Sequence, residues 1–234
     1  PPVTNVAAGA FESIGNPYAS AIDVRNIAKA GGVNEYFYVW DPRLGSSTGY
    51  GAYQEFLQSG DANNDYWIYP GGGSYPVFPT VYNNIQSGLA FLVDAPAGNP
   101  AGTVSFDENA KVNGSALFTT PVTAPAVSNM LNTTINAINA DGSTSLLDGS
   151  LILFNDNYSN NVNQSDARKL PNSGENLAIS DAGNLLEIEK RKMLTAQDTI
   201  FISLTNLEVA NYRFHFLAVN PGQLLQGFLV DNYL

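Results

Sequence analysis

Apolar and polar residues alternate along much of the second half of the chain. In NLLEIEK, Leu186 and Ile188 fall on one face of an extended segment, and Glu187 and Glu189 fall on the other. A period of two is the pattern of a β-strand with one buried and one exposed face, so we expect these two glutamates to face outward. Runs of the same kind are LNTTINA, SLILFND, TIFISLTNL and YRFHFLAV, separated by the turn signals DG, NSGEN and DAGN. Several short strands without intervening helices predict an antiparallel β-structure.

The first half of the chain predicts strands, long loops and one helix. EYFYVWDP has apolar or aromatic residues on both faces, which is typical of a strand covered on both sides. SAIDVRNIAKAGG predicts a short helix near residues 20–30, because Ser20 and Asp23 have the spacing of a capping box. Apolar residues recur from Val24 at helical intervals, and Gly31 provides a stop.

The composition changes at FTTPVTAPAVS, residues 118–128, where proline, threonine, alanine and valine predict an extended connector. We therefore expect two packed halves. A β-rich domain with the short helix and aromatic Gly/Pro loops occupies residues 1–119, and an antiparallel β-sandwich domain occupies residues 120–234. The predicted fold class is all-β, an antiparallel sandwich or jelly roll.

Charge and cysteine content narrow the classes of partner and site. The chain has 234 residues with a formal net charge of −11, which disfavours nucleic acid and anionic membranes as partners. Cysteine is absent, which removes disulfides, thiolate metal sites and thiol nucleophiles. No apolar run approaches the roughly 18 residues of a membrane-spanning helix, so we expect no membrane insertion.

The two ends of the chain predict a mature or excised piece of a larger protein. PPVTNVAAGA lacks the basic and apolar regions of a signal peptide. QGFLVDNYL, at the other end, predicts an apolar strand. We expect either this strand or the proline-rich start to pair with a neighbouring subunit by strand addition.

An oxygen-rich loop is the candidate metal site. FNDNYSNNVNQSDARK contains side-chain oxygens of the kind that calcium prefers, above all those of Asp156, Asn157 and Asp166. It lacks EF-hand spacing, and no other cofactor is indicated. A second stretch, GDANNDY, resembles half a calcium loop. The alternative for both is an ordinary turn, because Asn and Asp side chains hydrogen-bond their own backbone.

Aromatic residues between glycines and prolines are the candidate ligand or partner contacts. Displayed rings would stack on a sugar or a partner surface. The alternative is that they fold back as a small core beneath the loops. The candidates are Tyr50, Tyr66, Trp67, Tyr69, Tyr75 and Phe78, with Tyr53 and Tyr82 beside them.

The sequence gives no pattern of an enzyme. His215 is the only histidine, and its strand neighbours are aromatic or basic, which does not suit a catalytic triad. No GxSxG, phosphate loop or HExxH stretch is present. A glycoside hydrolase needs only two nearby carboxylates; Asp94, Asp107 and Glu108 are the candidates, with solvated surface acids as the alternative.

Several motifs in order resemble a module of large secreted surface proteins of Bacteroidota, which commonly lies near a type IX secretion sorting domain. The motifs are GNPYASAIDV, FYVWDPRLG, GGGSYP with IQSGLAFLV, SFDENAKV, ADGSTSLLDGSLILFNDNYSNNVNQSDARKLPNSGENLAI, LLEIEKR, DTIFISL and FLVDNYL. The resemblance implies a non-enzymatic, extracellular, structural, adhesive or gliding-associated module. Its expected partners are other copies of itself or neighbouring surface-protein domains. The alternative is a carbohydrate-binding module that uses the loop aromatics.

Overall fold

The computed structural model describes residues 2–45, 51–113, 129–208, 211–222 and 225–231. The chain is all-β, with 46% of these described residues in strands and 3% in helical turns. Most strand pairs are antiparallel, and the sheets pack on one another as the alternation predicted. Within these ranges, no helix has the length and hydrophobicity needed to cross a membrane.

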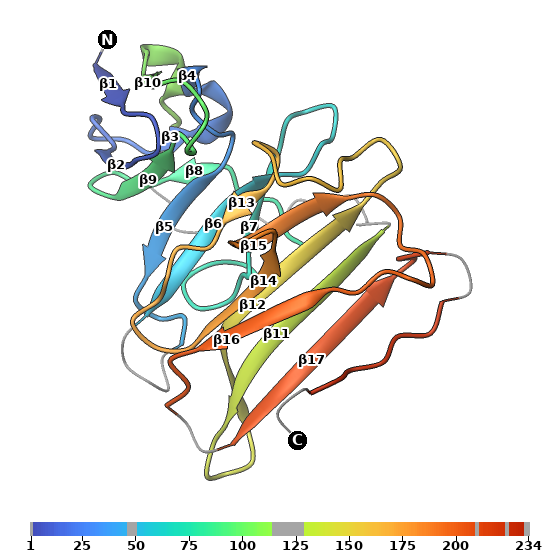
Figure 1. Cartoon of the computed structure of the whole chain (residues 1–234). Coiled ribbons are helices and arrows are strands. Elements are labelled where there is room, and N and C mark those ends of the chain that lie inside the picture. Colours follow the sequence, from blue (N-terminus) through green and yellow to red (C-terminus); the bar gives the residue numbers. More distant parts are fainter. Residues whose placement is uncertain (1, 46–50, 114–128, 209–210, 223–224, 232–234) are drawn as a thin grey trace.

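Three smaller sheets are built from the first half. A three-stranded sheet has the order β1 (Val3–Val6), β10 (Gly102–Ser105), β4 (Ala28–Gly31). A five-stranded sheet has the order β2 (Phe11–Gly15), β9 (Ala90–Asp94), β5 (Phe37–Asp41), β6 (Ala52–Gln58), β7 (Tyr66–Tyr69). The strands β3 (Ile22–Asp23) and β8 (Asn84–Ile85) form a short pair. Figure 1 shows the three-stranded sheet at the N-terminal end of the molecule, with the five-stranded sheet between it and the large sheet.

The second half forms one large sheet. Its order is β16 (Phe201–Thr205), β14 (Asn176–Asp181), β15 (Asn184–Arg191), β12 (Thr144–Phe154), β11 (Met130–Ile138), β17 (Tyr212–Val219), and β13 (Ala167–Arg168) also pairs with β15. The β12–β15 pair is parallel. The predicted DAGN turn joins β14 to β15 through Ala182 and Gly183, which both have positive φ, as a two-residue hairpin turn requires. Ile202 of β16 and Phe214 of β17 contact one buried cluster, so the sheet folds over on itself.

The two predicted halves share a hydrophobic core. One buried cluster joins Tyr38, Leu57 and Trp67 of the five-stranded sheet to Leu151 and Ile188 of the large sheet. A separate cluster fills the first half alone. The predicted boundary near residue 120 lies outside the described residues. The two halves are in contact through the shared cluster.

The helix predicted near residues 20–30 is a single 3₁₀ turn, η1 (Val24–Asn26). Asp23 caps it by accepting a hydrogen bond from the backbone N–H of Arg25 at 2.9 Å. Residues 28–31, which we expected to continue the helix, form β4 and pair with β10. Tertiary strand pairing outweighs the local helical spacing here. A second 3₁₀ turn, η2, spans Glu108–Ala110.

Two strand predictions in the second half need correction. Glu187 and Glu189 do not face outward: both are buried, because β15 is covered on both faces. The described part of QGFLVDNYL, residues 225–231, forms no strand. Its apolar residues Phe228, Leu229 and Val230 are instead 84%, 73% and 72% exposed.

Candidate functional site

The loop aromatics are core residues, which corrects the prediction that they are displayed. Tyr66, Trp67 and Tyr69 are buried in β7. Phe78 packs edge-on against Trp67 and Tyr69 at centroid distances of 5.7 and 5.2 Å. Tyr75 is partly buried and packs against the first-half cluster, and Tyr50 lies outside the described residues. The alternative of a core beneath the loops is confirmed for the described rings. Trp67, Tyr69 and Phe78 pack in the cluster shared with the large sheet, and Tyr66 and Tyr75 pack in the first-half cluster.

The predicted calcium ligands are not arranged as a metal site. Asp156 and Asn157 are exposed, whereas Asp166 is buried. Both carboxylate oxygens of Asp166 accept backbone N–H groups, from Lys190 and Asn163, each at 2.7 Å. In the described ranges, no three His, Cys, Asp or Glu side chains group as ligands. Asp166 therefore pins the loop to β15.

The second oxygen-rich stretch is a turn. Asp61 accepts hydrogen bonds from the backbone N–H groups of Asn63 and Asp65, each at 3.0 Å. The Asp65 carboxylate is taken up by Arg25, at 2.7 Å. The alternative of a self-satisfied turn explains these contacts.

The candidate hydrolase acids have separate structural partners. Asp94 is fully buried and holds Arg168 at 2.7 Å and the Asn34 amide at 2.9 Å. Asp107 instead caps η2, and Glu108 pairs with Lys111 on the surface. The Asp94–Arg168 ion pair thus joins the two halves of the chain.

A buried lysine and two buried carboxylates form the most unusual group in the described chain. Lys169 follows β13, Asp148 lies in β12 and Glu187 lies in β15. The Lys169 Nζ is 2.6 Å from Asp148 Oδ1 and 3.4 Å from Glu187 Oε2. Side-chain exposure is 3% for the lysine and 0% for both acids. Charges so deep in a protein need close partners to remain there.

The carboxylate oxygens of this cluster that do not contact Lys169 have different surroundings in Asp148 and in Glu187. The other Asp148 oxygen, Oδ2, accepts the backbone N–H of Leu177 at 2.7 Å. Glu187 Oε1 is buried without a hydrogen-bond partner in the described structure. Burial raises the pKa of Glu187 to about 8, with Lys169 opposing and Asp148 adding to the shift. Burial lowers the pKa of Lys169, but the charges of Asp148 and Glu187 outweigh it and leave the pKa raised. Glu187 is therefore suited to hold a proton at pH 7.

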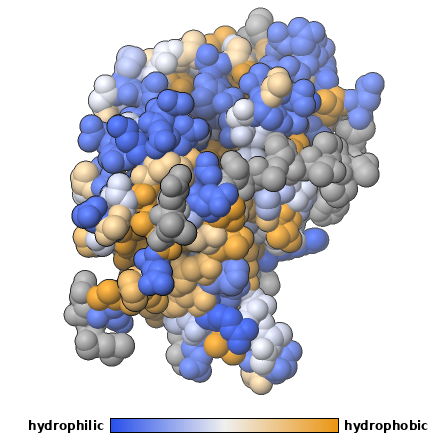
Figure 2. All heavy atoms as spheres, turned by 90° about the vertical axis from the view of Figure 1, so that its right-hand side faces the viewer, coloured by the Kyte–Doolittle hydropathy of each residue, from blue (hydrophilic) through white to orange (hydrophobic). Residues whose placement is uncertain are grey.

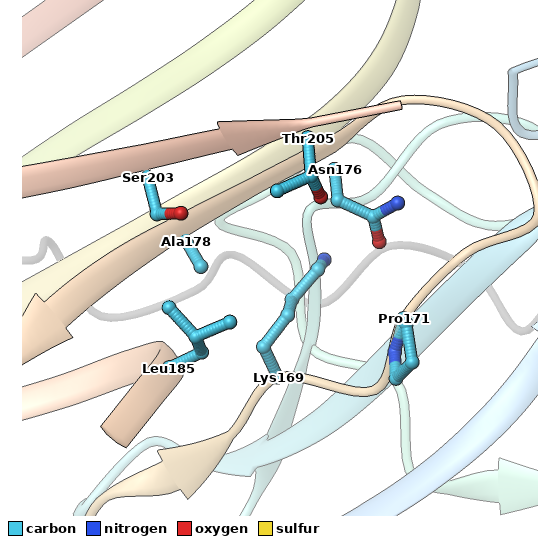
Figure 3. Close-up of a pocket in the computed structure, with 7 residues that line it drawn as sticks. All are labelled: Lys169, Pro171, Asn176, Ala178, Leu185, Ser203 and Thr205. Atoms are coloured by element: carbon cyan, nitrogen blue, oxygen red, sulfur yellow. The ribbon is translucent and has the colours of Figure 1, made fainter. Parts of the chain in front are cut away.

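A cavity of about 180 Å³ adjoins this cluster. It lies between β14, β16 and the segment that follows β13, and its lining includes Lys169, Asn176 and Thr205. Figure 3 shows the Lys169 side chain pointing into the space framed by Asn176 and Thr205. A water molecule fits a cavity of this size.

The edge of the large sheet at β17 is exposed and apolar, and it is the second candidate functional feature after the buried cluster. β17 is the last strand of the large sheet in the described structure, and Phe216 and Leu217 are 40% and 42% exposed on its two faces. The sole histidine, His215, is also exposed there. β17 lies on the right-hand side of Figure 1, and Figure 2 shows this side facing the viewer. Apolar surface covers the middle and lower part of the molecule in that view. The exposed large apolar residues of β16, β17 and the segments that follow them are Phe201, Leu204, Leu207, Phe216, Leu217, Phe228, Leu229 and Val230.

Residues 3–232 match the family model described as "Domain of unknown function (DUF8693)". The chain belongs to this family. Comparison with curated proteins and with solved structures returned no match.

Sequence reasoning missed the buried cluster of this family member altogether. Asp148, Lys169 and Glu187 are 21 and 18 positions apart along the chain. The available signal was weak: Asp148 and Glu187 each sit within an apolar strand segment, and a charge on a strand covered on both faces must find a partner. Lys169 lies in a polar stretch and carried no such signal. The exposed segment 225–231 was found as a candidate, although as a strand.

Proposed function

We propose that this chain is a structural module of an exported bacterial surface protein and that it assembles with other copies of itself by strand addition. The extracellular setting, and a role in adhesion or gliding through type IX secretion, rest on the resemblance to surface proteins of Bacteroidota. The observation that supports assembly is the pair of complementary features at β17 and at residues 225–231.

β17 supplies the acceptor. It pairs with β11 on one side, and within the described residues no strand pairs with its other side. An open edge exposes backbone N–H and C=O groups that can bind another strand. Apolar residues on both faces of this edge, Phe216 and Leu217, favour a partner strand that is also apolar on both faces.

Residues 225–231 supply the donor. Phe228, Leu229 and Val230 are consecutive, so an extended conformation places apolar groups on both of its faces. Seven extended residues span about 24 Å, and the eight residues of β17 span about 27 Å. The lengths match. Burial of these three side chains is worth about 1.5–3 kcal/mol each before the costs of ordering are subtracted.

Cysteine trapping between two distinguishable copies tests this pairing. The chain has no cysteine, so only introduced thiols can react. One copy carries Leu217→Cys and a tagged copy carries Leu229→Cys. We expect a disulfide-linked heterodimer under mild oxidation. In the matched control, the first copy carries Leu185→Cys in place of Leu217→Cys. Leu185 lies on β15 and has a similar exposed fraction, 46%.

The outcomes separate specific pairing from random collision. A heterodimer that forms with Leu217→Cys and not with Leu185→Cys supports strand addition at β17. Equal yields from the two positions, or no heterodimer at either position, would overturn the proposal.

The carbohydrate-binding alternative loses its main support, because the described candidate aromatics are buried or half-buried. No observation on the described surface favours it over assembly.

A further inference from the structure

We propose that Lys169 and Asp148 join covalently through an isopeptide bond, formed within the folded chain with Glu187 as the proton-transfer group. The substrate is the protein itself. The bond would link β12 to the segment after β13 and close the loop that contains the oxygen-rich stretch.

The reacting atoms are already in contact. The Lys169 Nζ is 2.6 Å from Asp148 Oδ1, and the carboxyl carbon is at most one carbon–oxygen bond farther away. Productive encounters place reacting atoms about 3–3.5 Å apart. Holding amine and carboxyl together in a packed core replaces a very unfavourable encounter in water with an intramolecular step.

The reaction balances without any other reagent. The Lys169 ammonium loses a proton, and the nitrogen lone pair attacks the Asp148 carboxyl carbon. A C–N bond forms and one C–O bond breaks, with its electron pair remaining on the departing oxygen. Two protons that were on nitrogen end on that oxygen, so one water leaves and a neutral amide remains.

Glu187 and Leu177 are placed to assist these steps. Glu187 Oε2 lies 3.4 Å from Nζ, within reach for a proton, and Oε1 has no other partner in the described structure. Glu187, which starts protonated, can give its proton to the departing oxygen and then take one from nitrogen, so it is regenerated at the end. The Leu177 N–H, 2.7 Å from Asp148 Oδ2, can stabilise negative charge on that oxygen as the carboxyl carbon becomes tetrahedral.

The surroundings favour the product. Amide formation removes two opposite charges from a site with 0–3% side-chain exposure, where charge is expensive to keep. The adjoining cavity gives the released water a way out.

Mass spectrometry of the purified full chain, denatured after folding, is the test. We expect an intact mass lower than the sequence mass by one water. Trypsin should fail to cleave after Lys169, and tandem spectra should show a branched peptide that joins Lys169 to Asp148.

Four variants assign the roles. Lys169→Arg keeps the positive charge without a suitable nucleophile and should show the full sequence mass, as should Glu187→Gln. Asp148→Asn should show no loss of water, because the group that leaves a carboxamide is ammonia. The control is Glu189→Gln, another buried glutamate two residues along the same strand, which should still lose water.

Two results would overturn the proposal. One is a full sequence mass for the folded wild-type chain after prolonged incubation. The other is a loss of water that persists in Lys169→Arg. Asp148 can also lose one water by closing a succinimide ring with the backbone nitrogen of Gly149, so persistence would assign the mass change to that ring and not to an isopeptide bond. The wild-type peptide map decides the matter even if a variant fails to fold.

Discussion

Glu55 lies within β6 with its carboxyl group fully buried between the two facing sheets. Neither carboxyl oxygen has a hydrogen-bond partner in the described structure. Burial raises the pKa of Glu55 well above its ordinary value. The charges of Glu187 and Asp94 raise this pKa further, and those of Lys169 and Lys190 oppose them. Glu55 should therefore be a neutral acid in the folded protein at pH 7.

The sign of the resulting pH dependence follows from proton linkage. Above its ordinary pKa, near 4.5, Glu55 is ionised in the unfolded chain but still protonated in the folded chain. The folded state then binds the extra proton, so stability falls by about 1.4 kcal/mol per pH unit as the pH rises toward the folded pKa. Glu55→Gln keeps the shape and stays neutral, so it removes this dependence. As the pH rises from 5.5 to 7.5, the variant should gain stability relative to wild type, by at most about 1.4 kcal/mol per pH unit.

Urea unfolding of both proteins at several pH values measures this difference. Buried acids that do not interact with Glu55, such as Glu189, contribute equally in both proteins and cancel in the comparison, whereas Glu187 titrates together with Glu55. Glu208→Gln, at an exposed position, serves as the control and should run parallel to wild type. If the Glu55→Gln and wild-type stabilities also run parallel from pH 5.5 to 7.5, Glu55 is ionised in the folded protein and the reasoning is wrong.

Three further predictions follow from the shared core and the charge. Leu151→Ala empties a fully buried position in the cluster common to both halves and should cost about 2–5 kcal/mol; tryptophan fluorescence and far-UV circular dichroism should shift together in urea, and separate transitions would contradict a shared core. Arg168→Met leaves the buried Asp94 carboxylate without its guanidinium partner and should cost about 3–5 kcal/mol in urea unfolding; a loss below about 1 kcal/mol would mean that the pair does not join the halves. Because copies with a net charge of −11 repel one another, the oligomer fraction in light scattering should rise from about 0.05 to 0.5 M NaCl; a fall would indicate association through charges.

The fold class could be predicted from the sequence because period-two alternation and turn residues act locally. The DAGN turn and the strands around it are examples. Burial by a facing sheet is not local, and this explains the errors at Glu187 and Glu189. The same applies to Trp67 and Tyr69, which look like loop residues among glycines and prolines but lie beneath the large sheet.

The helix predicted near residues 20–30 is a second case in which a distant part of the chain decides the local structure. The predicted capping box began at Ser20, whereas Asp23 caps the observed turn. β10, more than 70 positions along the chain, pairs with residues 28–31, and the helical turn ends at Asn26. The cluster of Lys169, Asp148 and Glu187 also depends on strand order, including the parallel β12–β15 pair. Nothing in the local sequence specifies that pairing.

Hydrogen exchange at low and high protein concentration tests assembly through β17 most directly. Strand addition predicts that backbone amides of residues 225–231 and of β17 become protected together as concentration rises. Val230→Asp should abolish that protection, whereas Val77→Asp, at a valine of equal exposure (72%) elsewhere on the surface, should leave it intact. Exchange at both segments that does not change with concentration would contradict the account.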